Sequence, residues 1–78
     1  MQYVYILQCA DGLYYTGCTH DLKARILSHS DGQVFATKSR LPVTLIFYCA
    51  FRNEEKAFGF EKYLKSGSGR ALVQKRFL

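Results

Sequence analysis

Two runs of β-branched and aromatic residues, 2–10 and 13–18, lie on either side of the dipeptide Asp11-Gly12. Such runs favour extended strands, and Asp-Gly is frequent in the tight turns that connect antiparallel strands. The sequence therefore predicts a β-hairpin at the start of the chain. The register of this hairpin decides which of its side chains share a face of the sheet.

The length of the hairpin loop decides where Tyr15 lies relative to Tyr5. A two-residue loop pairs Gln8 with Tyr15 and puts the two tyrosines on opposite faces. A three-residue loop, Ala10-Asp11-Gly12 with its glycine left-handed, pairs Leu7 with Tyr15 and makes the tyrosines diagonal neighbours on one face. Joint action of the two phenols requires the second register.

A helix is predicted after the hairpin. Thr19 can cap its start, Asp21 in the first turn is favourable against the helix dipole, and Asp31-Gly32 ends it. Arg25 and His29 are four residues apart, so they project from one face of this helix.

The second half of the chain contains a third predicted strand and a second predicted helix. The run 43–51 is almost wholly apolar or aromatic, which indicates a strand buried on much of both faces. Asn53 then caps a helix that has glutamates in its first turn and runs to Gly67.

A short last helix is predicted to start at Ser68, with Val73 and Phe77 packing inward. The elements therefore follow the order strand, strand, helix, strand, helix, helix, a small α+β fold. At 78 residues the chain, 1–78, is expected to be a single domain.

Charge and cysteine content suggest the kind of partner and the cellular compartment of the protein. The net charge is +5, and after Glu61 five basic residues occur with no acidic one, which favours a polyanionic partner over a simple solvated helix face. The three cysteines, an odd number without metal-ligand spacing, are expected to be reduced thiols. With no leader or membrane-spanning segment, a cytoplasmic protein is expected.

Glu61 lies at the edge of the apolar stripe of its helix, where an unpaired charge is unfavourable. One interpretation is a divalent metal, Mg²⁺ or Mn²⁺, which suits a single carboxylate completed by water and phosphate. The other is an ion pair with Lys65, four residues on.

The segment 66–70 lacks the lysine and spacing of a P-loop, so it predicts a flexible connector and no nucleotide cofactor.

These residues resemble the GIY-YIG nuclease superfamily, in particular its minimal single-domain, excision-nuclease-like (UPF0213-type) members. The resemblance covers nearly the whole chain. It rests on an ordered set of motifs: Tyr3-Val4-Tyr5, Tyr15-Thr16-Gly17, Asp21 to Arg25 with His29, Lys38 to Val43, Glu61 in Phe60-Glu61-Lys62-Tyr63-Leu64-Lys65, and Gly67 to Arg70.

The resemblance implies a three-stranded antiparallel sheet flanked by helices and a metal-dependent endonuclease. It implies that Tyr15 is the general base or positions the water, and that Tyr5 supports it by hydrogen bonding. Arg25 would hold the scissile phosphate, His29 would assist proton transfer or contact the phosphate, and Glu61 would bind the metal.

The expected substrate is DNA, recognised by structure rather than base sequence, in repair or recombination. The alternative is a non-catalytic nucleic-acid-binding module, or a subunit of a larger complex, that has lost efficient cleavage.

Two positions depart from the family pattern: Cys18 stands where many relatives carry a lysine, and Gln74 is the nearest amide to a missing asparagine. The residues expected to contact nucleic acid are Lys23, Lys38, Arg40, Lys65 and Arg70.

Overall fold

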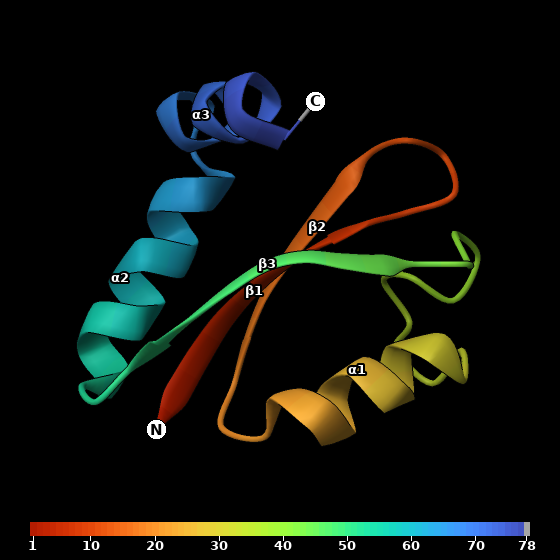
Figure 1. The fold of residues 1–78 in the computed structure, drawn as a ribbon, viewed down its shortest axis with the longest axis horizontal. Helices are drawn as coiled ribbons and strands as arrows, with labels where there is room; N and C mark the ends of the chain where they lie inside the picture. The colour runs from red at the N-terminus through yellow and green to blue at the C-terminus, as the bar shows by residue number, and fades with distance from the viewer. Residues whose placement is uncertain (78) are drawn as a thin grey trace.

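The computed structural model describes the backbone of residues 1–77 and the side chains of residues 1–76. Its three strands form one antiparallel sheet in the order β2-β1-β3, so the α+β class and the predicted order of elements are confirmed (Figure 1). The elements are β1 (Gln2–Gln8), β2 (Tyr14–Thr19), α1 (Leu22–Ser30), β3 (Thr44–Phe51), α2 (Glu54–Lys65) and α3 (Gly67–Phe77).

The hairpin has the three-residue loop. Leu7 pairs with Tyr15, and the Cys9 N–H donates to the Leu13 carbonyl at 2.8 Å. Gly12 has a φ of 81°, in the left-handed region that glycine adopts without strain. Tyr5 and Tyr15 therefore lie on one face of the sheet, as their joint action requires.

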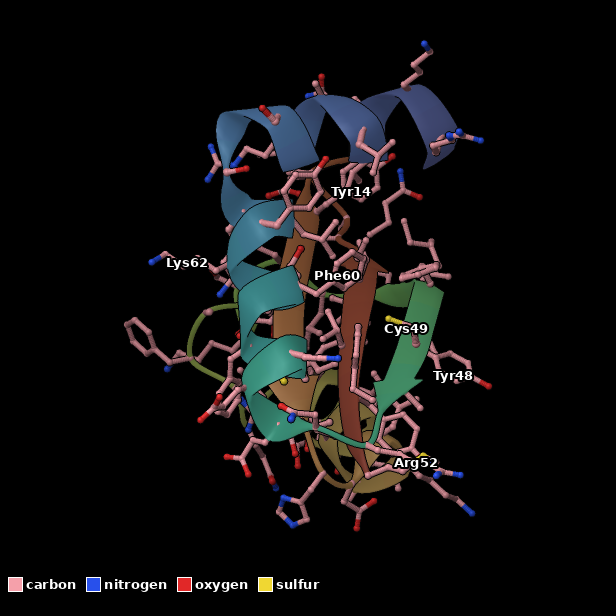
Figure 2. All side chains as sticks on the ribbon, turned by 90° about the vertical axis from the view of Figure 1, so that its left-hand side faces the viewer. Tyr14, Tyr48, Cys49, Arg52, Phe60 and Lys62 are labelled. Carbon is pink, nitrogen blue, oxygen red and sulfur yellow. The ribbon has the colours of Figure 1, made fainter. Side chains whose placement is uncertain are left out.

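The central strand β1 separates two layers of helix. Val4 and Ile6 are buried against α2 and α3 in the main core, while the Tyr5 ring contacts His29 of α1. Figure 1 shows α1 across the sheet from α2. Figure 2 shows Phe60 of α2 pointing onto the sheet and Lys62 pointing away from it. The buried members of this core are Val4, Ile6, Ala57, Leu64 and Val73.

The third strand differs from its prediction. None of its residues is fully buried, and Tyr48 is 55% exposed (Figure 2). The reason is its place in the sheet, because β3 is an edge strand that pairs only with β1. An apolar run alone predicts a central strand, and here β1 takes that position.

The start of α1 also differs from prediction. Asp21, not Thr19, is the N-cap of α1, with its side chain accepting from the Ala24 N–H at 3.1 Å. Thr19 instead accepts from the Asp21 N–H in the preceding turn. Asn53 caps α2 as predicted.

The segment between α2 and α3 is a tight corner and not a flexible connector. Ser66 ends α2, and its hydroxyl accepts from the Gly69 N–H at 3.2 Å, so Ser66 and not Ser68 caps α3. A Cβ on Gly69 would overlap the Tyr63 carbonyl oxygen and the Leu64 Cα, so glycine lets the two helices meet here. Val73 is buried as predicted, while the prediction for Phe77 lies outside the described side chains.

Among the described residues, no helix combines the length and the apolar character that a membrane span requires.

Candidate active site

The phenol oxygen of Tyr5 is the centre of a buried polar cluster at the β2 edge of the sheet. It lies 2.9 Å from His29 Nε2 and accepts from the Arg25 Nε–H at 3.4 Å. Tyr5 is fully buried, and burial raises the pKa of its phenol despite the hydrogen bond from Arg25, which lowers it. Tyr5 therefore keeps its proton at neutral pH and supports its neighbours by hydrogen bonding.

Gly17 makes room for this tyrosine. It is the β2 partner of Tyr5 across the sheet, and a Cβ built on Gly17 would overlap the hydroxyl end of the Tyr5 ring. The glycine that closes the Tyr15-Thr16-Gly17 motif thus lets the phenol pass over β2 and reach the sheet edge.

His29 is fully buried and held at both ring nitrogens. Its Nδ1 lies 2.8 Å from Thr37 Oγ1, and its Nε2 faces the Tyr5 phenol. Burial, and then the charge of Arg25, lowers its pKa, so the imidazole is neutral. With no exposed surface, His29 cannot contact a phosphate, which corrects one of the two roles expected for it. Its Nε2 is taken up by the Tyr5 phenol instead.

We expect the buried imidazole to make stability depend on pH. Because the folded-state pKa of His29 lies below its unfolded value of about 6.5, the unfolded chain binds the extra proton as the pH falls below about 6.5. The contribution of the neutral imidazole to the free energy of unfolding should be fully present above that pH. Below it the free energy of unfolding should decline, with a slope of at most about 1.4 kcal/mol per pH unit, until the pH reaches the folded pKa. Urea unfolding between pH 7.5 and 5 measures this slope.

The variant His29→Gln should flatten this decline, although it lowers the stability at pH 7.5 by removing buried hydrogen bonds. The matched control is His20→Gln, which replaces an exposed histidine. A decline that persists in His29→Gln and disappears in His20→Gln would contradict the assignment.

Tyr15 lies beside this cluster and is partly exposed. Its ring centroid is 6.5 Å from that of Tyr5 and 5.2 Å from that of His29. Hydrogen bonding to Tyr5, and also to Tyr15, raises the pKa of Arg25, so the guanidinium interacts with both phenols. Arg25 is itself exposed. The structure therefore brings four of the five predicted catalytic residues together.

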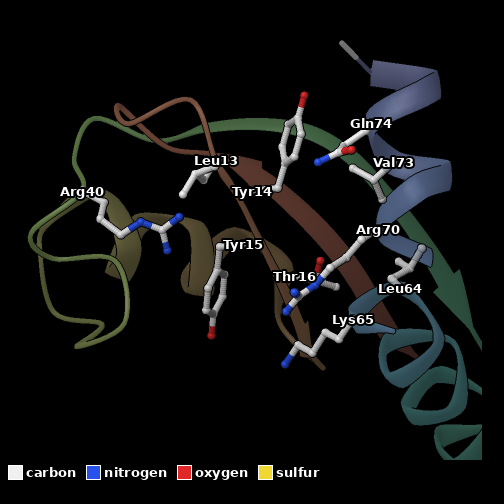
Figure 3. Close-up of a pocket in the computed structure, with 10 residues that line it drawn as sticks. All are labelled: Leu13, Tyr14, Tyr15, Thr16, Arg40, Leu64, Lys65, Arg70, Val73 and Gln74. Atoms are coloured by element: carbon white, nitrogen blue, oxygen red, sulfur yellow. The ribbon is translucent and has the colours of Figure 1, made fainter. Parts of the chain in front are cut away.

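A groove of about 420 Å³ opens next to Tyr15 (Figure 3). In Figure 3, Arg40 lies on one side of the Tyr15 ring and the side chains of Lys65 and Arg70 lie on the other. Three of the five basic residues expected to contact nucleic acid thus line one groove. Gln74, the amide noted in the sequence, lines it as well.

The remaining two basic residues lie elsewhere. Lys23 lines a second, shallow hollow between α1 and the sheet, together with Tyr3 and Tyr48. Lys38 lies on the loop between α1 and β3, with its ammonium 5.3 Å from the ring centroid of Phe35. Arg40, within the groove, makes an ion pair of 2.8 Å with Asp11 of the hairpin loop.

Glu61 is held by a cation already present in the chain. Its Oε2 lies 3.1 Å from Lys65 Nζ, and its side chain is 21% exposed. After burial and the other larger causes, the Glu61 charge also raises the pKa of Tyr5, which places the carboxylate within electrostatic reach of the cluster. The ion pair predicted as the alternative to a metal ligand is therefore present.

The donor set fits one hard divalent ion. Within the described residues, no group of three or more His, Cys, Asp or Glu side chains converges on a metal position. Glu61 offers one partly exposed carboxylate, which is paired here with the Lys65 ammonium. Mg²⁺ commonly binds through one or two carboxylates and completes its shell with waters and substrate phosphate.

Thr37 is the site residue that sequence reasoning missed. It is fully buried and anchors His29 from a loop whose residues show no strand or helix periodicity. A short polar side chain in such a segment gives no sequence signal of burial, so only the structure reveals it.

The chain matches the family model described as the GIY-YIG catalytic domain over residues 1–76. It is 41% identical over 70 residues to a UPF0213 protein of Streptococcus pyogenes, covering 88% of this chain and 76% of that protein. A UPF0213 protein of Streptococcus agalactiae is 39% identical over 72 residues, 91% of this chain and 82% of that protein. The solution NMR structure of a UPF0213 protein from Bacillus halodurans superposes with a TM-score of 0.60 at 38% identity, covering 97% and 86% of the two chains.

Proposed function

Because this chain belongs to the GIY-YIG family, whose catalytic domain implies nuclease activity on nucleic acid, we propose that it is a divalent-metal-dependent endonuclease. Its proposed substrate is DNA, recognised by shape rather than by base sequence, in repair or recombination. The observation that carries this proposal is that Tyr15, which lies beside Tyr5 and its partner Arg25, also lines a groove that contains basic side chains.

Tyr15 is the proposed general base or water-positioning group. It is the phenol that reaches the groove, whereas the Tyr5 phenol is buried and occupied by His29. A phenol can orient a water molecule by hydrogen bonding, and its deprotonated form can take a proton from that water. The guanidinium of Arg25 lies within electrostatic reach of the Tyr15 phenol.

Arg25 is the proposed phosphate ligand. Its Nε is directed at the Tyr5 phenol, and its exposure leaves the rest of the guanidinium available to a phosphate oxygen. Glu61 would hold the ion, which when bound polarises the phosphoryl oxygen and stabilises charge on the leaving oxygen. In that state Lys65 would be released from Glu61 and could pair with the DNA backbone in the groove.

A panel of labelled duplex, flap, branched and single-stranded DNA, incubated with Mg²⁺, Mn²⁺ or EDTA, tests the function. We expect cleavage only with a divalent ion, on some structures of the panel and irrespective of their base sequence. Tyr15→Phe should lower the rate by about a hundredfold, within the usual contribution of general base catalysis. Its matched control is Tyr63→Phe, an exposed tyrosine of α2 that does not line the groove.

The rival function is a nucleic-acid-binding module without turnover, and the Glu61–Lys65 ion pair is the observation that favours it. In such a protein the ammonium would neutralise the carboxylate permanently. Binding of DNA with no cleavage of any substrate in the panel, in either metal, would decide for this alternative.

A further inference from the structure

The loop between α1 and β3 presents an exposed aromatic ring with a cation beside it. Phe35 is 84% exposed, and Lys38 Nζ lies 5.3 Å from its ring centroid. Single exposed apolar residues are common on protein surfaces. The pairing with a lysine is a second feature, because an aromatic face beside a cation is the combination that proteins use to hold single-stranded nucleic acid.

The loop holds this pair in a defined position. The Lys38 N–H donates to the Val34 carbonyl at 2.9 Å, which closes one helical turn. Residues three apart lie on the same side of such a turn. Val34 and Thr37 are therefore buried on its inner side, and Phe35 and Lys38 share the outer side.

The same turn is connected directly to the candidate active site. Thr37, next to Lys38, bonds to His29, which bonds in turn to Tyr5. The Arg40 N–H donates to the Thr37 carbonyl at 2.8 Å, and the Arg40 side chain lines the groove beside Tyr15. The turn that carries Phe35 and Lys38 is thus hydrogen-bonded to residues of the candidate active site.

We propose that Phe35 and Lys38 form a stacking platform for one unpaired base of the substrate. The proposal rests on the proposed function and narrows its substrate class to DNA that has a single-stranded segment beside the cleaved bond. The bases of an intact duplex have their faces covered by their neighbours, so only an unpaired base can lie on the ring. Lys38 would then move from the ring face to an adjacent phosphate.

Fluorescence anisotropy with a labelled oligothymidylate and with a labelled duplex, both in EDTA, measures binding without cleavage. Phe35→Leu should weaken single-strand binding by about tenfold, the usual loss on removing one stacked base, and leave duplex binding unchanged. Lys38→Gln should lower the salt dependence of single-strand binding by roughly one phosphate contact, a slope change of about 0.7.

Two further variants complete the test. Phe58→Leu replaces an exposed phenylalanine of α2, 46% exposed, that lies in another element, and it should change neither affinity. Phe35→Trp keeps an aromatic face and should retain single-strand binding. The proposal is overturned if Phe35→Leu leaves single-strand affinity intact or lowers both affinities equally.

The binding assay and the cleavage panel can fail separately. A protein that cleaves DNA but binds single strands without Phe35 keeps the proposed function and loses this platform. A protein that binds single strands through Phe35 but cleaves nothing keeps the platform and loses the nuclease.

Discussion

Replacing Glu61 by glutamine (Glu61→Gln) is expected to lower metal-dependent cleavage by about a hundredfold or more, equal to roughly 2.7 kcal/mol of transition-state stabilisation. Glutamine keeps the shape of the side chain and removes its charge. The described residues contain no group of three or more acidic, histidine or cysteine side chains that could hold the ion in its place. Initial rates at saturating Mg²⁺ and Mn²⁺ measure the loss.

The stability of this variant separates metal binding from folding. An exposed ion pair contributes at most about 1 kcal/mol, and Lys65 is 52% exposed in its pair with Glu61, so thermal unfolding should change little. Lys65→Gln is the informative companion, because it removes the competing ammonium and should lower the Mg²⁺ concentration needed for half-maximal rate. Cleavage at the wild-type rate by Glu61→Gln would remove the metal assignment, and Glu55→Gln, an exposed acid at the start of the same helix, is the control.

The hairpin was predictable because local chemistry determines it. Asp11-Gly12 predicted the turn but left a two-residue and a three-residue loop open. The structure contains the three-residue loop, the one that joint action of Tyr5 and Tyr15 requires. Asn53 was likewise predictable as the N-cap of α2, and its side chain accepts from the Lys56 N–H. Each of these features depends on residues that are close in the chain.

Features that depend on distant partners were less predictable. The four-residue spacing of Arg25 and His29 placed them on one helix face. It could not show that His29 is fully buried and bonded to Thr37 of a later loop, whereas Arg25 is exposed. Similarly the apolar run of β3 could not reveal its position at the sheet edge. Spacing could place Glu61 near Lys65, yet it left both an ion pair and a metal ligand open.

Gly17→Ala is expected to produce a large loss of stability. The added Cβ would overlap the hydroxyl end of the Tyr5 ring, and Tyr5 is fully buried, so the ring has little free space to move into. Overpacking of this kind usually costs about 1–3 kcal/mol, or roughly 5–20 °C in melting temperature for a domain of this size. Thermal unfolding followed by circular dichroism measures it.

Gly59→Ala is the matched control, because a Cβ on Gly59 of α2 meets no atom within 4 Å and alanine favours helix by about 0.5–1 kcal/mol. The same change at two glycines should therefore shift the melting temperature in opposite directions. In a Tyr5→Leu background, Gly17→Ala should lose most of its effect, because the ring that it strikes is gone. If the penalty at Gly17 were unchanged in that background, the strain would lie in the β2 backbone, and Gly17 would not be the residue that lets the Tyr5 phenol reach Arg25 and His29.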